Sequence, residues 1–308
     1  MKNTIVTTTL AALLVASNAR AQREERFNRT LDVGPDAALS IGNIAGDIQV
    51  EGGPGSSIVI EAVKSVEDEG DAGDLKTVDI EVSQLGNRVR VSTEHTGRGR
   101  HHGDHVSVRY HVKVPKGTEV DIQSVSGNVV LTGVAGPANA QSVSGDVRVT
   151  DVTELVQAKS VSGNVEVRSS RSERHVEIES VSGEVLVMDI EADELTVSSV
   201  SGDVRLQGVS SQRASLESVS GDLEYTGTIR AGGRYDFQSH SGDVVLTIGD
   251  QVGFELEAST FSGEVESDFT LKTTSRAKKG GRLSAVVGDG SAFIEATTFS
   301  GDVRLMRR

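Results

Sequence analysis

The four-residue pattern Ser/Thr-x-Ser-Gly occurs nine times in this chain at an almost constant interval. Successive glycines of the pattern are 18 to 21 residues apart, and the last interval of 38 residues equals two periods of 19. A fixed period near 20 residues indicates one structural unit stacked on itself many times. The glycines of the pattern are Gly127, Gly145, Gly163, Gly183, Gly202, Gly221, Gly242, Gly263 and Gly301.

Apolar and polar residues alternate just before each pattern. With the first Ser or Thr of the pattern taken as position zero, the residues two and four places earlier are apolar and those between are polar, as in Val176-Glu177-Ile178. This alternation predicts a half-buried strand. The residues at position zero are Ser124, Ser142, Ser160, Ser180, Ser199, Ser218, Ser239, Thr260 and Thr298.

A second strand is expected after each glycine. Positions plus five and plus seven are apolar, as in Val147 and Val149, with Ser267 as the exception at plus seven. The apolar positions are even-numbered before the pattern and odd-numbered after it, so the chain must turn a corner near each Ser-Val step. At that step position plus one is Val in six patterns and His240, Phe261 or Phe299 in the other three.

These patterns together predict an all-β fold, a parallel β-helix or β-solenoid of about 9–11 rungs with a repeat of about 19 residues. Each rung carries at least two short strands, and rungs stack about 4.8 Å apart in parallel register. The usual hand of parallel crossovers favours a right-handed coil. A glycine in every rung is expected where the chain bends or where backbones crowd.

The two ends of the chain depart from the repeat. Residues 1–21 have the features of a secretory signal peptide, because Lys2 precedes an apolar stretch at 5–16 and Ala19-Arg20-Ala21 is a small-x-small cleavage site. Residues 22–119 are expected to form a strand-rich cap with a first rung at 38–50 and alternating segments at 58–66, 77–82, 88–93 and 106–114. Residues 120–308 are the solenoid, with a degenerate rung at 270–291.

Charge and composition limit the partners and the compartment. The formal net charge is −14, which opposes binding to nucleic acid or anionic lipid. The chain has no cysteine, so it has no disulfide and no lipid attached through a cysteine. Export without disulfides is consistent with a periplasmic, cell-surface or extracellular location. We expect no stable membrane insertion after signal cleavage.

A polar column at position plus four is a candidate cation site. Acidic residues stand about one rung apart in five consecutive rungs, from Glu184 to Glu264, and a divalent cation would relieve their repulsion. The simpler interpretation is that Asp and Asn suit the turn after glycine. The column comprises Asn128, Asp146, Asn164, Glu184, Asp203, Asp222, Asp243, Glu264 and Asp302.

Other candidate groups point to structure rather than chemistry. A histidine-rich loop at 101–105, with His95 nearby, matches no established metal site. His240 is interpreted as a histidine packed in the core. The serine column from Ser126 to Ser300 lacks accompanying histidines, so we expect hydrogen bonds between rungs instead of nucleophiles. The sequence therefore names no catalytic, cofactor-binding or metal-binding residue.

Three segments resemble the bacterial putative-adhesin family of β-strand-repeat domains. They are Ser-Val-Ser-Gly-Asp-Val-Arg-Val at 142–149, Val-Pro-Lys-Gly at 114–117 and Thr-Phe-Ser-Gly-Asp-Val-Arg-Leu at 298–305. The resemblance covers about 27–308 and implies an exported β-helical domain, which in relatives is often attached to the envelope. It supplies no catalytic residues. This chain departs from anchored relatives because it has no second hydrophobic segment.

Three functions remain open at this point. The first is a non-enzymatic envelope or cell-surface protein whose repetitive face binds an envelope protein, a glycan or its own copies. The second is an accessory or sensor protein of an envelope-stress system. The third is a polysaccharide-active β-helix enzyme, which the absence of tryptophan and the presence of only three tyrosines disfavour.

Overall fold

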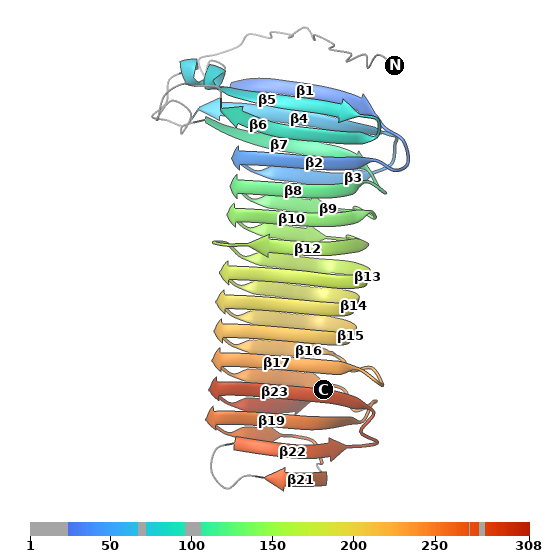
Figure 1. Cartoon of the computed structure of the whole chain (residues 1–308), viewed down its shortest axis with the longest axis vertical. Coiled ribbons are helices and arrows are strands. Elements are labelled where there is room, and N and C mark those ends of the chain that lie inside the picture. The colour runs from blue at the N-terminus through green and yellow to red at the C-terminus, as the bar shows by residue number, and fades with distance from the viewer. Residues whose placement is uncertain (1–23, 67–71, 96–105, 271, 277–280) are drawn as a thin grey trace, which may run out of the picture.

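A computed structural model describes residues 24–66, 72–95, 106–270, 272–276 and 281–308. These residues are almost entirely β-structure: 24 strands join in one open sheet, and a 3-10 helix covers Ala72–Thr77. The strands stack into a tall column with the chain's N-terminal part at one end (Figure 1). The all-β class predicted from the sequence is confirmed.

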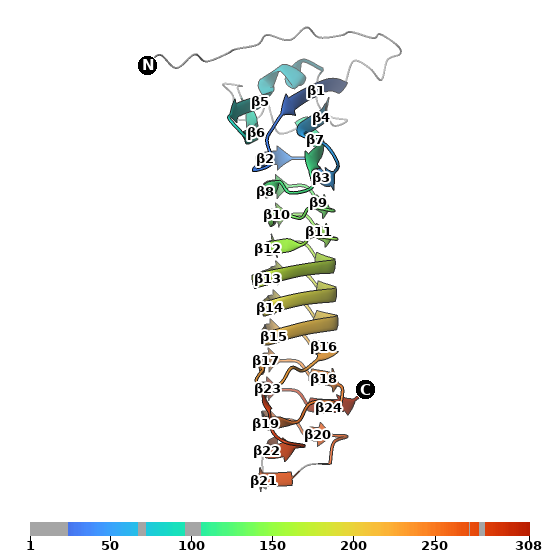
Figure 2. The ribbon, with the colours of Figure 1, turned by 90° about the vertical axis from the view of Figure 1, so that its right-hand side faces the viewer.

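Each repeat contributes one extended segment to each of two stacks, which face one another, and the three longest strands run through both stacks (Figure 2). Ser142 pairs in parallel with Ser124 on one side and Ser160 on the other, and Val147 pairs with Val129 and Val165. The repeats in this region are built by β8 (Glu119–Ser126), β9 (Val129–Thr132), β10 (Pro137–Ser144), β11 (Val147–Thr150), β12 (Glu154–Ser160), β13 (Val165–Ser182), β14 (Val185–Ser201), β15 (Val204–Ser220), β16 (Leu223–Thr228), β17 (Arg234–Ser241) and β18 (Val244–Ile248).

The core lies between the two stacks. The apolar columns predicted from the alternation are buried in it, for example Val176 and Ile178 from one stack and Val147 and Val149 from the other. Toward the C-terminal end larger side chains fill the same space, since Tyr225 contacts Phe237 edge-on with ring centroids 5.2 Å apart. Small branched side chains thus fill most rungs, and aromatic rings fill the later ones.

Glycine is required at the first corner of each repeat because successive backbones touch there. A Cβ atom on Gly145 would collide with the carbonyl oxygen of Gly127, and one on Gly163 would collide with that of Gly145. The same contact recurs through the column to Gly301 and Gly263. The expectation that backbones crowd at this glycine is confirmed.

The N-terminal end closes the stack with further strands. The early repeat at β2 (Ala38–Ala45) and β3 (Ile48–Gly53) pairs in parallel with β8 and β9. On the outer side, β6 (Arg88–His95) pairs with β2 and forms a hairpin with β5 (Val78–Leu85). On the other stack β7 (Val106–Pro115) pairs with β3, followed by antiparallel β4 (Ser57–Val66) and β1 (Glu24–Asp32). Strands thus cover most of this N-terminal part, and the signal peptide predicted at 1–21 lies outside the described residues.

The C-terminal end differs from the expected order of rungs. The last repeat, β23 (Ala292–Ser300) and β24 (Val303–Arg307), lies between β17–β18 and the preceding repeat, β19 (Phe254–Ser262) and β20 (Val265–Ser267). The segment read as a degenerate rung at 270–291 instead contains a hairpin of β21 (Lys272–Arg276) and β22 (Gly281–Val287), and β22 pairs antiparallel with β19.

The filling of the core explains this rearrangement. Val303 and Leu305 of β24 are fully buried, whereas β20 has only three residues, Val265 is half-buried and Ser267 stands where other repeats have an apolar residue. The well-filled repeat therefore takes the interior place, and the poorly filled repeat lies at the end under the hairpin.

Candidate functional site

The acidic column forms a ladder of hydrogen bonds between repeats. Asp146 Oδ1 accepts a bond from the backbone N–H of Asn164 at 3.0 Å, and Asn128 Oδ1 accepts one from the N–H of Asp146 at 2.9 Å. Equivalent bonds link the other steps of the column in which the acceptor is Asp or Asn. The short Asp and Asn side chains reach the neighbouring backbone, which explains their place after the glycine.

Arginines neutralise part of this column. Arg205 contacts Asp203 at 2.7 Å and Glu184 at 2.9 Å, and its pKa is raised, first of all by the hydrogen bond to Glu184. Arg148 contacts Asp146 at 2.7 Å. Among the described residues no group of three or more His, Asp or Glu side chains could hold a metal ion. The histidine-rich loop at 101–105 lies outside the described residues.

The serines of the repeat have two different roles. In seven of the nine patterns the buried hydroxyl at position zero donates to a glycine carbonyl of the neighbouring repeat, as from Ser142 to Gly127 at 2.9 Å and from Ser160 to Gly145 at 2.8 Å. The buried hydroxyls of Ser124 and Ser218 have no such partner among the described residues. The exposed serine two places later contributes its backbone carbonyl, which accepts from a glycine N–H. The expected side-chain bonds between rungs therefore belong to the first serine of the pattern and not to the column Ser126–Ser300.

An exposed row of mostly apolar side chains runs along the corner between these serines. We define the apolar ridge as the residues at position plus one in every repeat, in stacking order. Of the ten large apolar side chains that are exposed in the described part of the chain, eight belong to this ridge. The ridge comprises Ile44, Val125, Val143, Val161, Val181, Val200, Val219, His240, Phe299 and Phe261.

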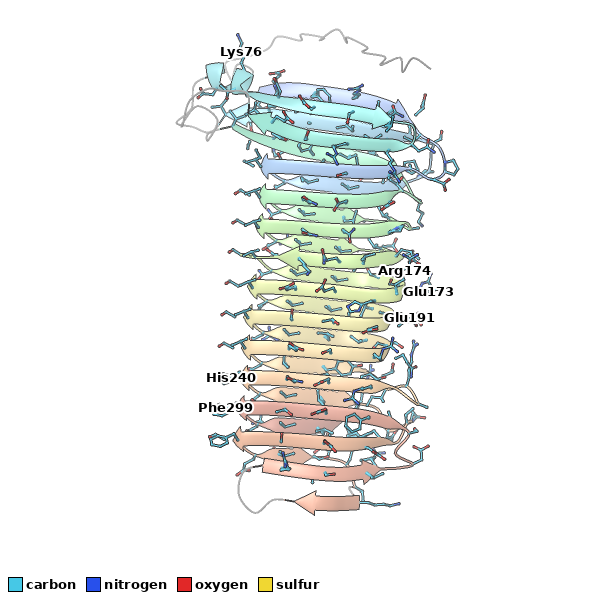
Figure 3. The ribbon with its side chains drawn as sticks, viewed as in Figure 1. Lys76, Glu173, Arg174, Glu191, His240 and Phe299 are labelled. Carbon is cyan, nitrogen blue, oxygen red and sulfur yellow. The ribbon has the colours of Figure 1, made fainter. Side chains whose placement is uncertain are left out.

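The C-terminal end of the ridge is aromatic. Phe299 stacks between His240 and Phe261, with ring centroids 5.1 and 4.8 Å apart and interplanar angles of 9° and 3°. Phe261 is 73% exposed and Phe299 is 50% exposed. His240 and Phe299 both point outward from the same edge of the column (Figure 3). The expectation of a core histidine at His240 is wrong, because position plus one lies outside the corner and not between the stacks.

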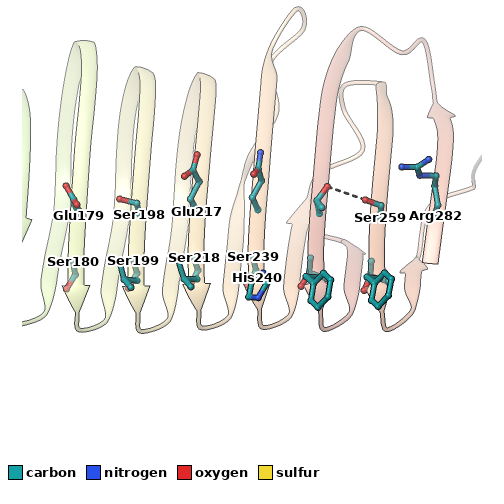
Figure 4. A pocket seen from close by; sticks show the side chains of 18 residues that line it. Glu179, Ser180, Ser198, Ser199, Glu217, Ser218, Ser239, His240, Ser259 and Arg282 are labelled. Atoms are coloured by element: carbon teal, nitrogen blue, oxygen red, sulfur yellow. Dashed lines mark hydrogen bonds between the residues drawn. The ribbon is translucent and has the colours of Figure 1, made fainter. Parts of the chain in front are cut away.

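A groove follows the ridge on one side. Two adjoining hollows of about 990 and 480 Å³ share Glu179 and together extend from Ile44 to Phe261. Their far wall is the polar column one place before position zero, which includes Glu179, Ser198 and Glu217 (Figure 4). Side chains on both walls recur at every repeat, so the groove offers a repeated contact instead of one enclosed pocket.

Four charged side chains line the groove, Lys159, Glu179, Glu217 and Arg282, and the first two pair with one another. Lys159 contacts Glu179 at 2.8 Å and Glu177 at 3.0 Å. Partial desolvation lowers the pKa of Lys159, but these two hydrogen bonds outweigh it and raise the pKa overall. The hydrogen bond from Lys159 lowers the pKa of Glu177. Besides Lys159 and Glu179, the residues one place before position zero in the nine patterns are Gln, Ser or Thr, apart from Glu217.

Every residue of the ridge belongs to the repeat at position plus one, where the sequence pattern predicts only that the chain turns. The pattern does not show that these side chains form a surface. One signal was available: in six of the nine patterns an apolar residue has serine on both sides, at a corner that neither strand can bury.

The fold and this surface define an all-β repeat protein with one continuous exposed edge. The Toastrack DUF4097 family matches residues 66–306, and the chain belongs to this family. No curated protein matches the chain. Among the described residues no helix is long and apolar enough to cross a membrane.

Several solved structures match most of the chain at low sequence identity. A putative adhesin from Bacteroides fragilis is 12% identical, with a TM-score of 0.43, and the match covers 92% of this chain and 97% of that one. A putative adhesin from Parabacteroides distasonis is 12% identical, with a TM-score of 0.41 and coverage of 91% and 97%. A putative lipid binding protein from the same species is 12% identical, also with a TM-score of 0.41, and coverage is 91% and 96%.

Proposed function

We propose that this chain is an exported, non-enzymatic, adhesin-like protein of the cell envelope or cell surface, and that it binds another surface through the apolar ridge and its groove. In this proposal the two stacks form a parallel β-solenoid with about 19 residues to a turn and a right-handed coil. Export follows from the signal-peptide features at 1–21.

One observation carries the proposal: the exposed apolar residues are concentrated at a single repeated position. Soluble monomers scatter such residues singly over the surface, whereas a continuous row of them marks an interaction site. Here eight of ten lie in one line. A polar side chain at this exposed corner would cost the core nothing, so the recurrence of apolar side chains there points to a binding role.

The chemistry of the groove supports a non-enzymatic role. Catalysis needs a nucleophile, an acid or a base held near one reacting atom with perturbed proton affinity. The groove instead repeats Ser, Thr and Gln at successive levels, and its charged Lys159 already contacts Glu177 and Glu179. A surface that presents the same kinds of side chain at every repeat suits attachment to an extended or repetitive partner.

The proposal is tested by adhesion of purified protein to defined surfaces. Beads that carry residues 22–308 are mixed with peptidoglycan sacculi, with outer-membrane vesicles and with beads that carry the same chain. We expect saturable binding to at least one of them. The double variant Phe261→Ser/Phe299→Ser should weaken binding about tenfold, whereas Leu85→Ser, another exposed apolar residue on the cap hairpin, should not.

Three results would overturn the proposal. Binding to none of the surfaces removes the adhesive role. Release of soluble sugars from the sacculi favours the polysaccharide-active enzyme. Capture of one membrane-embedded protein from the vesicles in a fixed ratio, with no loss in the Phe261→Ser/Phe299→Ser variant, favours the accessory or sensor protein of an envelope-stress system.

A further inference from the structure

The ridge has a fixed spacing that few partners can match. Its ten side chains stand on successive levels of the column, which are about 4.8 Å apart, so the row is about 43 Å long. A partner that contacts every level must carry its own contacts at the same spacing. The ridge of a second copy of this chain meets that requirement at all levels.

The flanks of the ridge permit two copies to approach one another. Despite the net charge of −14, the column at position plus two is serine at every patterned level, from Ser126 to Ser300. The acidic side chains of the ladder, such as Asp146 and Asp203, lie on the other side of the pattern glycine, where arginines pair with them. Like charges are therefore kept away from the corner that two copies would share.

The area of the ridge is also appropriate for a dimer. Each half-exposed valine can bury on the order of 50 Å² on contact, and the two phenylalanines more, which gives roughly 500–700 Å² for each copy. Stable interfaces bury about 800 Å² for each partner. The flanking serines and the near wall of the groove supply the difference.

We propose that the apolar ridge is a self-association surface, and that two copies of this chain pair ridge to ridge in antiparallel fashion. This inference rests on the proposed function because it names the partner of the same surface. The two-fold axis crosses the ridge between Val181 and Val200. Full overlap then places the aromatic end of each copy against Ile44 and Val125 of the other.

The antiparallel arrangement has two further consequences. It brings the grooves of the two copies to the same side of the contact between the two ridges, where they form one wider channel. It also places Lys159, level with Val161, across from the partner's Glu217, level with Val219. Opposite charges therefore face one another on both sides of the axis.

Sedimentation equilibrium of the purified chain, with no other component, tests self-association. We expect a dimer at micromolar concentration. The variant Val143→Asp/Val200→Asp should weaken the dimer about 100-fold. The control Val130→Asp/Val245→Asp makes the same change in charge on the opposite stack and should leave it unchanged. Circular dichroism confirms that each variant is folded.

Single cysteines test the arrangement, since the natural chain has none. Val181→Cys lies beside the axis and should form disulfide-linked dimers on mild oxidation. In the variant Val125→Cys the two cysteines of a dimer lie seven levels apart, about 34 Å, and should not form a disulfide. Equal linking of both variants overturns the antiparallel arrangement.

The outcomes also separate this inference from the proposed function. A monomer at all concentrations, or an equal loss of dimer in the Val130→Asp/Val245→Asp control, overturns the self-association. If the monomer still binds sacculi or vesicles through Phe261 and Phe299, the adhesive function stands without it. If the dimer forms but no surface is bound, the adhesive function fails and the self-association stands.

Discussion

The carbonyl oxygen of Gly127 occupies the space in which a Cβ atom on Gly145 would have to lie. Both groups are backbone, so neither can move away without opening the hydrogen bonds that join the two repeats. The same relationship links each later pair of pattern glycines. The repeat therefore depends on glycine for close approach of the backbone, and not only for its freedom to turn.

We expect Gly145→Ala to lower the free energy of unfolding by about 2–4 kcal/mol, because the added methyl group forces neighbouring repeats apart. Urea denaturation followed by circular dichroism measures the change. Gly249→Ala is the matched control, because its Cβ would meet no atom within 4 Å. Equal losses in the two variants would show that crowding at the corner is not the cause.

The ladder of Asp and Asn side chains allows a second test. Asp146→Ala removes the acceptor for the N–H of Asn164 and the partner of Arg148, so we expect a loss of about 1–2 kcal/mol in the free energy of unfolding. Asp146→Asn keeps a side-chain oxygen acceptor and should lose about half as much. If Asp146→Asn lowers the free energy of unfolding as much as Asp146→Ala does, the ion pair with Arg148 supplies the stabilisation and the hydrogen bond of the ladder does not.

The same ladder predicts the response to chelation. The Oδ1 atoms of Asp146 and Asp203 accept backbone N–H groups, and their Oδ2 atoms contact arginines. We therefore expect the melting temperature to be the same with calcium and with excess chelator. A drop on chelation would place a structural cation on the column after all.

Much of this architecture follows from the sequence because the pattern reports directly on burial. Val176 and Ile178 alternate with Glu177 and Glu179, and they are buried and outward-facing as that alternation requires. The recurrence of the pattern fixes the parallel register, since Ser142 must lie beside Ser124 to keep every column continuous.

The order of the C-terminal repeats and the exposed position of His240 could not be predicted in the same way. All repeats share one template, so nothing in the local pattern says which repeat is the neighbour of β17. The repeat next to β17 is the one that fills the core better. Val303 and Leu305 of the last repeat are fully buried, whereas Val265 is half-buried and Ser267 is polar in the repeat before it. The expectation of a core position for His240 fails for a related reason, because the pattern gives the faces of strands but not which side of a corner faces solvent.

The inserted position of the last repeat predicts its hydrogen exchange. Residues 293–300 pair on both sides, with β17 and with β19, so their amides should exchange about as slowly as those of β15. Residues 265–267 and 272–276 lie at the end of the column and should exchange faster. A chain stacked in simple sequence order would show the reverse, with the last strand fraying first.

Truncation gives an independent measurement of the same feature. A chain that ends at residue 291 loses β23 and β24 and leaves β17 and β19 facing one another unpaired. We expect this variant to aggregate, because two parallel edges become exposed. In contrast, removal of the terminal rung of a stack in sequence order would leave a soluble, slightly shorter column, and that outcome would contradict the insertion.

The three tyrosines predict the behaviour of the folded chain in alkali. Burial raises the pKa of Tyr110 to about 12, although its hydrogen bond with Thr93 opposes the shift. Burial also raises the pKa values of Tyr225 and Tyr235. An unfolded tyrosine titrates near 10. Their contribution to stability is therefore complete below about pH 10 and is lost as the pH rises through the folded pKa values.

Absorbance at 295 nm measures this directly, because the chain contains no tryptophan and only these three tyrosines. We expect little tyrosinate at pH 10–11 in the folded protein, followed by a rise that coincides with loss of the circular dichroism signal. In concentrated guanidinium the same chain should titrate near pH 10. A full titration near pH 10 with the β-structure intact would mean that the rings are accessible, and that the aromatic packing around Tyr225 and Phe237 is not as described.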